Sequence, residues 1–271
     1  MIDQAFTQPG FQTPAMTLIR DGDEQTRRLG CCDVGGEAHG GPHGGPRGNY
    51  WAPGILGTDC FIHLGDAGQD ISGSVHVDMR LVQDARVPLS EPLTIQGTTE
   101  RTEEVAKGRM LFQVFRFGSG NGRTPIRCKI GVLVPNPEKM TGGRKPGAPP
   151  VDPRDGFLKK AERTLVPDDV TTYGGAGNPI HHDPAFAQSL GYRAPIAHGV
   201  MTAAWLLGAL DNPYAPSTLD VRFTFNRPVF WDDLMELWVE EGAKPGAVRY
   251  RALNADGRMT AEMTVVDVSY D

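Results

Sequence analysis

The sequence predicts an α+β protein in which two related halves each wrap a curved antiparallel sheet around an apolar helix. Residues 199–210 read GVMTAAWLLGAL and carry no charge on any face, so a helix at this position must be buried all round. Strand-like segments separated by hairpin-like breaks follow this helix, at residues 219–223, 234–240, 246–253 and 259–268. A helix followed by four short strands favours a sheet that curves around the helix.

The first half of the chain repeats this order of strands. VDMRL at residues 77–81 resembles LDVRF at 219–223, and each segment is followed by a basic residue and a proline. Further strand-like segments then follow in the first half, at residues 93–98, 107–117 and 127–134. A shared tetrapeptide pattern and a shared order favour an internal duplication over two unrelated meanders.

The predicted boundary between the halves is a segment rich in glycine and proline. Residues 141–156 contain few large apolar side chains and several prolines, which is typical of a surface linker between residues 1–140 and residues 157–271. The N-terminal counterpart of the buried helix should fall near residues 51–64. Pro53, Gly54 and Gly57 interrupt that stretch, so we expect a degenerate N-terminal repeat. A second glycine-rich run, residues 35–54, favours neither a regular helix nor a central strand, and the sequence assigns it no role.

Composition excludes several classes of protein. The 271 residues are 39% apolar and 22% charged, which predicts a globular chain with a real core. The net charge of −6 comes without a basic stripe, so we expect no nucleic-acid partner, and a phosphate-bearing substrate would need a local Arg or Lys. The N-terminus lacks the pattern of a secretory signal, and the apolar segment 203–210 is too short to span a membrane. We therefore expect a cytoplasmic protein.

The cysteines predict neither disulfides nor a metal site. The spacing of the four cysteines forms no disulfide framework. Cys31, Cys32, His39 and His43 could together offer four zinc ligands, but adjacent cysteines do not easily chelate one ion and a CxxC spacing is absent. We expect no metal.

One stretch carries chemistry. Residues 173–205 read YGGAGNPIHHDPAFAQSLGYRAPIAHGVMTAAW. The stretch resembles the hydratase 2 motif of MaoC-like dehydratases, also called (R)-specific enoyl-CoA hydratases. That family has a loop of the form S/G-G-D-x-N-P-[LI]-H-x-D, followed by an A/V-H-G-[MV] step that opens the buried helix. The matching residues are Gly175, Asn178, Pro179, Ile180, His181, Asp183 and residues 197–200. The rest of the chain agrees in pattern with the family's double hot-dog fold.

The resemblance implies a reaction and the residues that perform it. The family adds water reversibly to a trans-2-enoyl thioester of CoA or a carrier protein, giving a (3R)-3-hydroxyacyl thioester, without a cofactor or a metal. Its acid/base pair is an Asp and a His, which correspond to Ala176 and His181. Its oxyanion donor is the backbone N–H that corresponds to Gly199, at the start of a buried helix. Asn178 and Val200 complete the expected substrate-binding residues. A homodimer is left open.

Ala176 departs from the pattern because a methyl group can neither accept a proton nor hold a water molecule. Three accounts remain. In the first, the natural enzyme carries Asp at this position and the chain is a deliberately inactivated form. In the second, the chain is a natural variant that uses another base or catalyses another reaction on acyl thioesters. In the third, the chain binds acyl thioesters without catalysis, as an assembly protein would. A hot-dog acyl thioesterase is a further alternative, but the sequence signals no carboxylate to activate water at the carbonyl carbon.

Neighbouring polar residues have simpler expected roles. Asp183 before Pro184 is typical of a helix N-cap. We expect His182 to face solvent and His198 to order the turn before the buried helix. Arg193 could meet the phosphate of a thioester carrier, although an exposed arginine is usually solvated.

Overall fold

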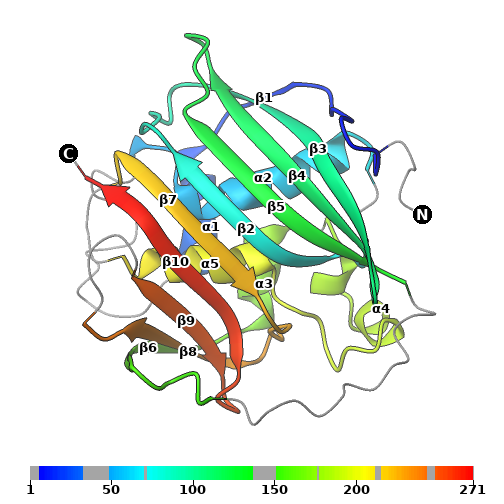
Figure 1. The fold of residues 1–271 in the computed structure, drawn as a ribbon, viewed down its shortest axis with the longest axis vertical. Coiled ribbons are helices and arrows are strands. Elements are labelled where there is room, and N and C mark those ends of the chain that lie inside the picture. The colour runs from blue at the N-terminus through cyan, green and yellow to red at the C-terminus, as the bar shows by residue number, and fades with distance from the viewer. Residues whose placement is uncertain are drawn as a thin grey trace.

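The computed structural model describes residues 6–32, 49–69, 72–136, 151–175, 177–210, 215–242 and 248–270. The described strands form one ten-stranded sheet in the order β1-β3-β4-β5-β2-β7-β10-β9-β8-β6, with every pairing antiparallel. The strands are β1 Met16–Leu18, β2 Val75–Gln83, β3 Leu93–Val105, β4 Gly108–Ser119, β5 Ile126–Pro135, β6 Phe157–Thr164, β7 Thr218–Phe225, β8 Leu234–Glu240, β9 Arg249–Asn254 and β10 Met259–Ser269. The sheet curves across the whole molecule (Figure 1).

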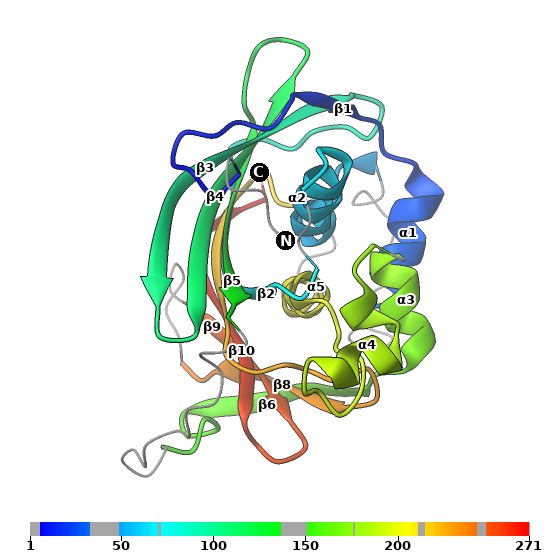
Figure 2. The same cartoon turned by 90° about the vertical axis from the view of Figure 1, so that its right-hand side faces the viewer.

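The helices lie on the concave side of this sheet. They are α1 Gly22–Gly30, α2 Pro53–Asp66, α3 Pro167–Gly174, the 3-10 turn η4 Pro179–His181, α4 Pro184–Ser189 and α5 Gly199–Gly208. Helices α2 and α5 lie within the curve of the sheet, and α1, α3 and α4 lie on their far side (Figure 2). Within the described residues, none of these helices is both long enough and apolar enough to cross a membrane.

The register between β2 and β7 has the symmetry of a duplicated unit. Arg80 lies opposite Arg222 at the centre of the sheet, Met79 lies opposite Phe223, and Leu81 lies opposite Val221. The predicted match of VDMRL with LDVRF makes Arg80 equivalent to Arg222 and Met79 equivalent to Val221. Equivalent residues therefore exchange places across the β2–β7 centre, as a twofold relation requires. The boundaries 1–140, 141–156 and 157–271 stay a prediction, because residues 137–150 lie outside the described residues.

The expectation of a degenerate N-terminal helix is wrong. Helix α2 is regular over 14 residues and begins at Pro53, where a missing N–H costs nothing. Gly54 and Gly57 serve its packing against α5. A Cβ at Gly54 would lie 3.3 Å from the Cα of Ala204, and a Cβ at Gly57 would lie 2.7 Å from Cγ1 of Val200. The two glycines therefore let two helix backbones approach closely, and both repeats keep their central helix.

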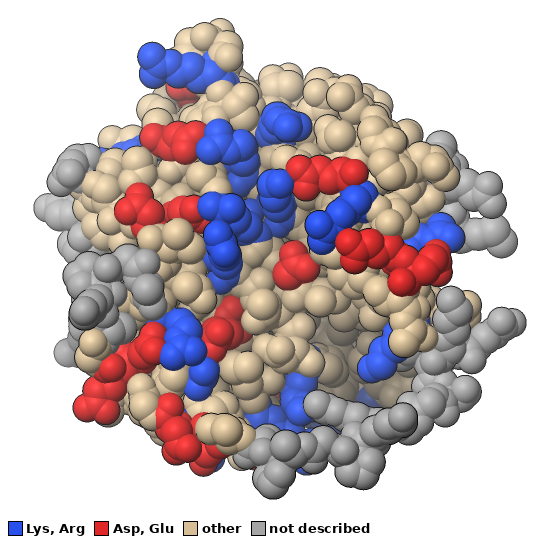
Figure 3. Space-filling view, viewed as in Figure 1, with Lys and Arg blue, Asp and Glu red and all other residues tan. Residues whose placement is uncertain are grey.

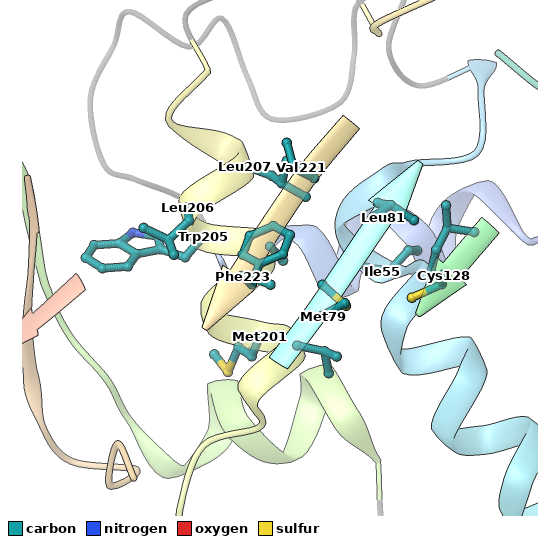
Figure 4. Close-up of a cluster of buried hydrophobic side chains, with 14 of the residues drawn as sticks. Ile55, Met79, Leu81, Cys128, Met201, Trp205, Leu206, Leu207, Val221 and Phe223 are labelled. Carbon is teal, nitrogen blue, oxygen red and sulfur yellow. The ribbon is translucent and has the colours of Figure 1, made fainter. Parts of the chain in front are cut away.

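The core fills the space between the sheet and these two helices. Alternate residues of β2 and β7 point inward, while Arg80 and Arg222 point outward. Figure 4 shows this layer, with side chains of β2 and β7 lying between α2 and α5. Its labelled members are Ile55, Met79, Leu81, Cys128, Met201, Trp205, Leu206, Leu207, Val221 and Phe223. Helix α5 is buried on all sides, as its charge-free sequence predicted.

Candidate active site

A cavity of about 610 Å³ lies where the two repeats meet. Its walls come from α2, the start of β2, the loop after α3, the start of α5 and the end of β7. The space-filling view shows a hollow in the surface between the end of β7 and α4 (Figure 3). Four of the predicted site residues line the cavity: Asn178, His181, Gly199 and Val200. The structure thus brings together both parts of the motif, although their catalytic roles stay predictions.

His181 is held as a neutral base. Asn178 caps the η4 turn by accepting a hydrogen bond from the N–H of Ile180, which fixes the backbone before His181. Nδ1 of His181 lies 2.8 Å from the carbonyl oxygen of Ile196. Since a carbonyl oxygen only accepts, Nδ1 carries the proton and Nε2 is left with a free lone pair. Burial lowers the pKa of His181 to about 4, so the imidazole is neutral at physiological pH.

His198 packs directly on His181. The two rings stack with centroids 3.5 Å apart and an interplanar angle of 29°. His198 occupies the N-cap position of α5, but its side chain makes no capping hydrogen bond. Its ring is wedged against Gly174, where a Cβ would lie 2.6 Å from Cδ2 of His198 and closer still to Nε2 and Cε1. Burial first, and the neighbouring His181 second, hold the pKa of His198 well below its usual value.

The start of α5 supplies backbone donors. The first amides of a helix have no intrahelical acceptor, so the N–H groups of Gly199 and Val200 are free to stabilise a negative oxygen. His76 of β2 lies against this turn: a Cβ at Gly199 would be 3.2 Å from its Nδ1. His76 lies between Phe61 and Phe225, with ring centroids 5.1 and 4.5 Å away, and burial lowers its pKa to about 3. Sequence reasoning missed His76, because nothing in the local pattern links the start of β2 to the motif.

Three arginines near the motif or the cavity differ in their ion pairs and in their exposure to solvent. Arg193, which the sequence left open as a phosphate contact, pairs its guanidinium with both Asp232 and Asp233. Arg227 is exposed at the end of β7 and lines the cavity. Arg28 of α1 also lines the cavity but is only 12% exposed. Neither Arg227 nor Arg28 was singled out from the sequence as a binding residue.

The structure confirms the predicted role of Asp183 and corrects that of His182, the two residues that follow His181. Asp183 accepts hydrogen bonds from the N–H groups of Ala185 and Phe186, which confirms its prediction as the N-cap of α4. His182 does not simply face solvent: the side chain is half-buried, and its buried Nε2 has no hydrogen-bond partner in the described part of the chain. It lies in the short connection between η4 and α4.

Position 176 lies outside the described residues. Gly175 and Gly177 on either side both line the cavity. Gly175 ends α3 with a φ of +66°, a conformation that favours glycine. Among the described residues that line the cavity, Asp66 is the one carboxylate, and it is exposed. The described part of the site therefore offers a neutral base and amide donors, with no buried carboxylate.

Two of the four residues that were considered as zinc ligands lie within the described residues. Cys31 and Cys32 are buried at the end of α1 and form no disulfide within the described residues, whereas His39 and His43 lie outside them. Over the ranges that the structure describes, no three His, Cys, Asp or Glu side chains gather as metal ligands would.

Comparison with known proteins supports the recognised motif. Residues 151–255 match the family model described as a MaoC like domain. The chain is 25% identical over 178 residues to the 3-hydroxyacyl-thioester dehydratase X of Mycobacterium tuberculosis, covering 63% of this chain and 60% of that protein. It is also 25% identical over 189 residues to the peroxisomal multifunctional enzyme type 2 of Drosophila melanogaster, covering 64% of this chain and 32% of that protein. The chain thus spans less than two thirds of the length of either relative.

Solved structures show the same fold over nearly the whole chain. The crystal structure of HtdX from Mycobacterium tuberculosis matches with a TM-score of 0.76 at 21% identity, covering 94% of this chain and 100% of that one. A Mycobacterium tuberculosis protein described as having a double hot-dog fold matches with a TM-score of 0.63 at 11% identity, covering 95% of each chain. The predicted double hot-dog fold is confirmed.

Proposed function

We propose that this chain, which belongs to the MaoC-like dehydratase family, has a site built to interconvert trans-2-enoyl and (3R)-3-hydroxyacyl thioesters of CoA or a carrier protein. The observation that carries the proposal is the tautomer of His181. Its Nδ1 proton is committed to Ile196, and the free Nε2 lies in the same cavity as the amides that start α5. A neutral base and a ready oxyanion site are what addition of water to an enoyl thioester requires.

Each part of the reaction has a corresponding group. As the water oxygen bonds to C3, Nε2 of His181 takes one of its protons. The electron pair of the C2–C3 double bond shifts to give an enolate, whose oxygen accepts hydrogen bonds from the amides of Gly199 and Val200. A proton then returns to C2 on the same face and the thioester carbonyl re-forms. Dehydration runs through the same groups in reverse, and the reaction as proposed needs no cofactor.

Ala176 removes the second member of the acid/base pair. The chain is therefore expected to bind an enoyl thioester but to hydrate it poorly, since His181 alone must take one proton and deliver another. Ala176→Asp should raise the rate roughly 10²–10⁴-fold, the usual contribution of a positioned acid or base. Binding should change little, because the amides of α5 and the cavity do not depend on that carboxylate.

The test follows the loss of enoyl-thioester absorbance for the chain and for Ala176→Asp, with short and long acyl groups. His181→Ala in the Asp form should abolish the gain, while Gly177→Ala, one residue from the substituted position, should not. Full-speed hydration by the Ala form would show that the acid/base assignment is wrong. Binding without turnover in both forms would support a non-catalytic acyl-binding protein, and release of free thiol would support a thioesterase.

A further inference from the structure

Arg28 brings a nearly buried cation to a cavity expected to hold an acyl chain. Its side chain is 12% exposed, and Nη2 lies 2.6 Å from Oε1 of Glu24, one turn earlier in α1. Its Nη1 is buried and has no hydrogen-bond partner among the residues that the structure describes. Interaction with the end of the helix dipole does not require this placement, because Arg27 in the same turn is exposed to solvent. A buried guanidinium N–H without an acceptor is costly, and a ligand acceptor that Nη1 reaches by a rotation of the Arg28 side chain would remove that cost.

The position of Arg28 is close to the reacting groups. Three charged residues are found among the described residues that line the cavity, and of these Asp66 and Arg227 are exposed whereas Arg28 is not. The charge of Arg28 contributes to the lowered pKa of His198, which stacks on His181. Arg28 therefore brings a positive charge to the inner wall next to the paired histidines, and Glu24 of the same helix is its ion-pair partner.

We propose that the acyl part of the substrate carries a carboxylate, which pairs with Arg28 inside the cavity. This rests on the proposed function, because it assigns the acyl group of the same thioester. A plain alkyl chain would leave Nη1 unsatisfied and a charge against apolar atoms, whereas a carboxylate accepts hydrogen bonds from a guanidinium with matching geometry. The ion pair between Glu24 and Arg28 can break to admit the ligand, since the side chain of Glu24 is 31% exposed and water can solvate it instead.

The test is a binding titration that does not depend on turnover. Two thioether analogues of CoA serve as ligands, identical except that one acyl-like chain ends in a carboxylate and the other in a carboxamide of the same size. Calorimetry with the unaltered chain should show a preference of about 10-fold or more for the carboxylate, as for a desolvated charged hydrogen bond. Arg28→Gln should reduce the preference to less than about 2-fold by the same reasoning. Arg28→Lys should retain part of it, and Arg27→Gln should retain all of it.

Glu24→Gln gives a prediction of opposite sign, because it frees Arg28 from its internal partner and should strengthen carboxylate binding further. Equal affinity for both ligands in the unaltered chain, or an undiminished preference in a folded Arg28→Gln protein, would overturn the inference. Both of those results leave the proposed function standing, since the carboxamide still binds. Failure of both ligands to bind, together with no enoyl hydration by Ala176→Asp, would overturn the proposed function instead.

Discussion

Gly174 limits the position of the stacked histidines, and Gly174→Ala is expected to disturb them. The new Cβ would fall 2.6 Å from Cδ2 of His198 and nearer to two other ring atoms. Ordinary contact begins near 3.4 Å, so the ring must move by at least about 0.8 Å. His181 blocks movement on one side, because the ring centroids are already 3.5 Å apart.

The energetic result is a balance of two terms. Overpacking of this kind costs typically about 1–3 kcal/mol. Gly174 is the last residue of α3, and replacing a glycine by alanine there returns roughly 0.5–1 kcal/mol of backbone entropy. We therefore expect a net destabilisation between about 0 and 2.5 kcal/mol. Displacing His198 should also loosen the orientation of His181 and lower the activity of the Ala176→Asp form.

Gly177→Ala is the matched control. Gly177 belongs to the same loop and its φ is not positive, and none of the described residues beyond its chain neighbours lies within 4 Å of the Cβ it would gain. Urea denaturation would measure stability, and NMR titration of the histidine ring protons would report their pKa values. If Gly174→Ala matches Gly177→Ala in both measurements, then the ring of His198 is not confined between Gly174 and His181 in solution.

Two further substitutions test the electrostatics of the cavity. The pKa of His76 is about 3 in the folded chain and about 6.5 when unfolded, so protonation favours the unfolded state as pH falls below 6.5. In urea denaturation, the free energy of unfolding of His76→Phe should thus exceed that of the parent by roughly 1–2 kcal/mol at pH 5 and be about equal to it at pH 8. Equal stability of the two proteins at both pH values would contradict a buried, neutral ring. Arg227→Gln should raise the KM for a CoA thioester and weaken its salt dependence, while leaving an N-acetylcysteamine thioester, which has no phosphate, unchanged. Arg222→Gln, an exposed cation on the outer face of the sheet, is its control; an equal effect on both thioesters would argue against a phosphate contact.

The features that the sequence predicted are those specified by local patterns. The VDMRL and LDVRF segments indicated a duplication, and they lie side by side as β2 and β7. The charge-free residues 199–210 indicated a helix buried on all sides, and the motif placed His181 and Gly199 at one cavity. Each of these depends on residues close together in the chain or on the burial of one element.

Features that depend on contact between distant elements could not be predicted. Gly54 and Gly57 look like helix breakers until α5 is seen against them, because helix propensity is a weak tendency that close packing overrides. Arg28 and His76 reach the cavity from α1 and β2, far from the motif in the chain. Arg193 is exposed as expected, but two aspartates that follow it by about forty residues neutralise it.

The two proposed carboxylates, one at position 176 and one on the substrate, should interfere with each other. Gly175 and Gly177 flank position 176 and line the same cavity as Arg28, the least exposed cation among the described residues of its wall. Two like charges in one poorly solvated cavity raise each other's free energy, and they compete for one guanidinium. Ala176→Asp should therefore lower the preference for the carboxylate ligand by several-fold in the same calorimetric titration, while carboxamide binding stays constant. A preference that is unchanged in the Asp form would show that the two carboxylates occupy separate parts of the cavity, and that Arg28 recognises the acyl chain away from the reacting carbons.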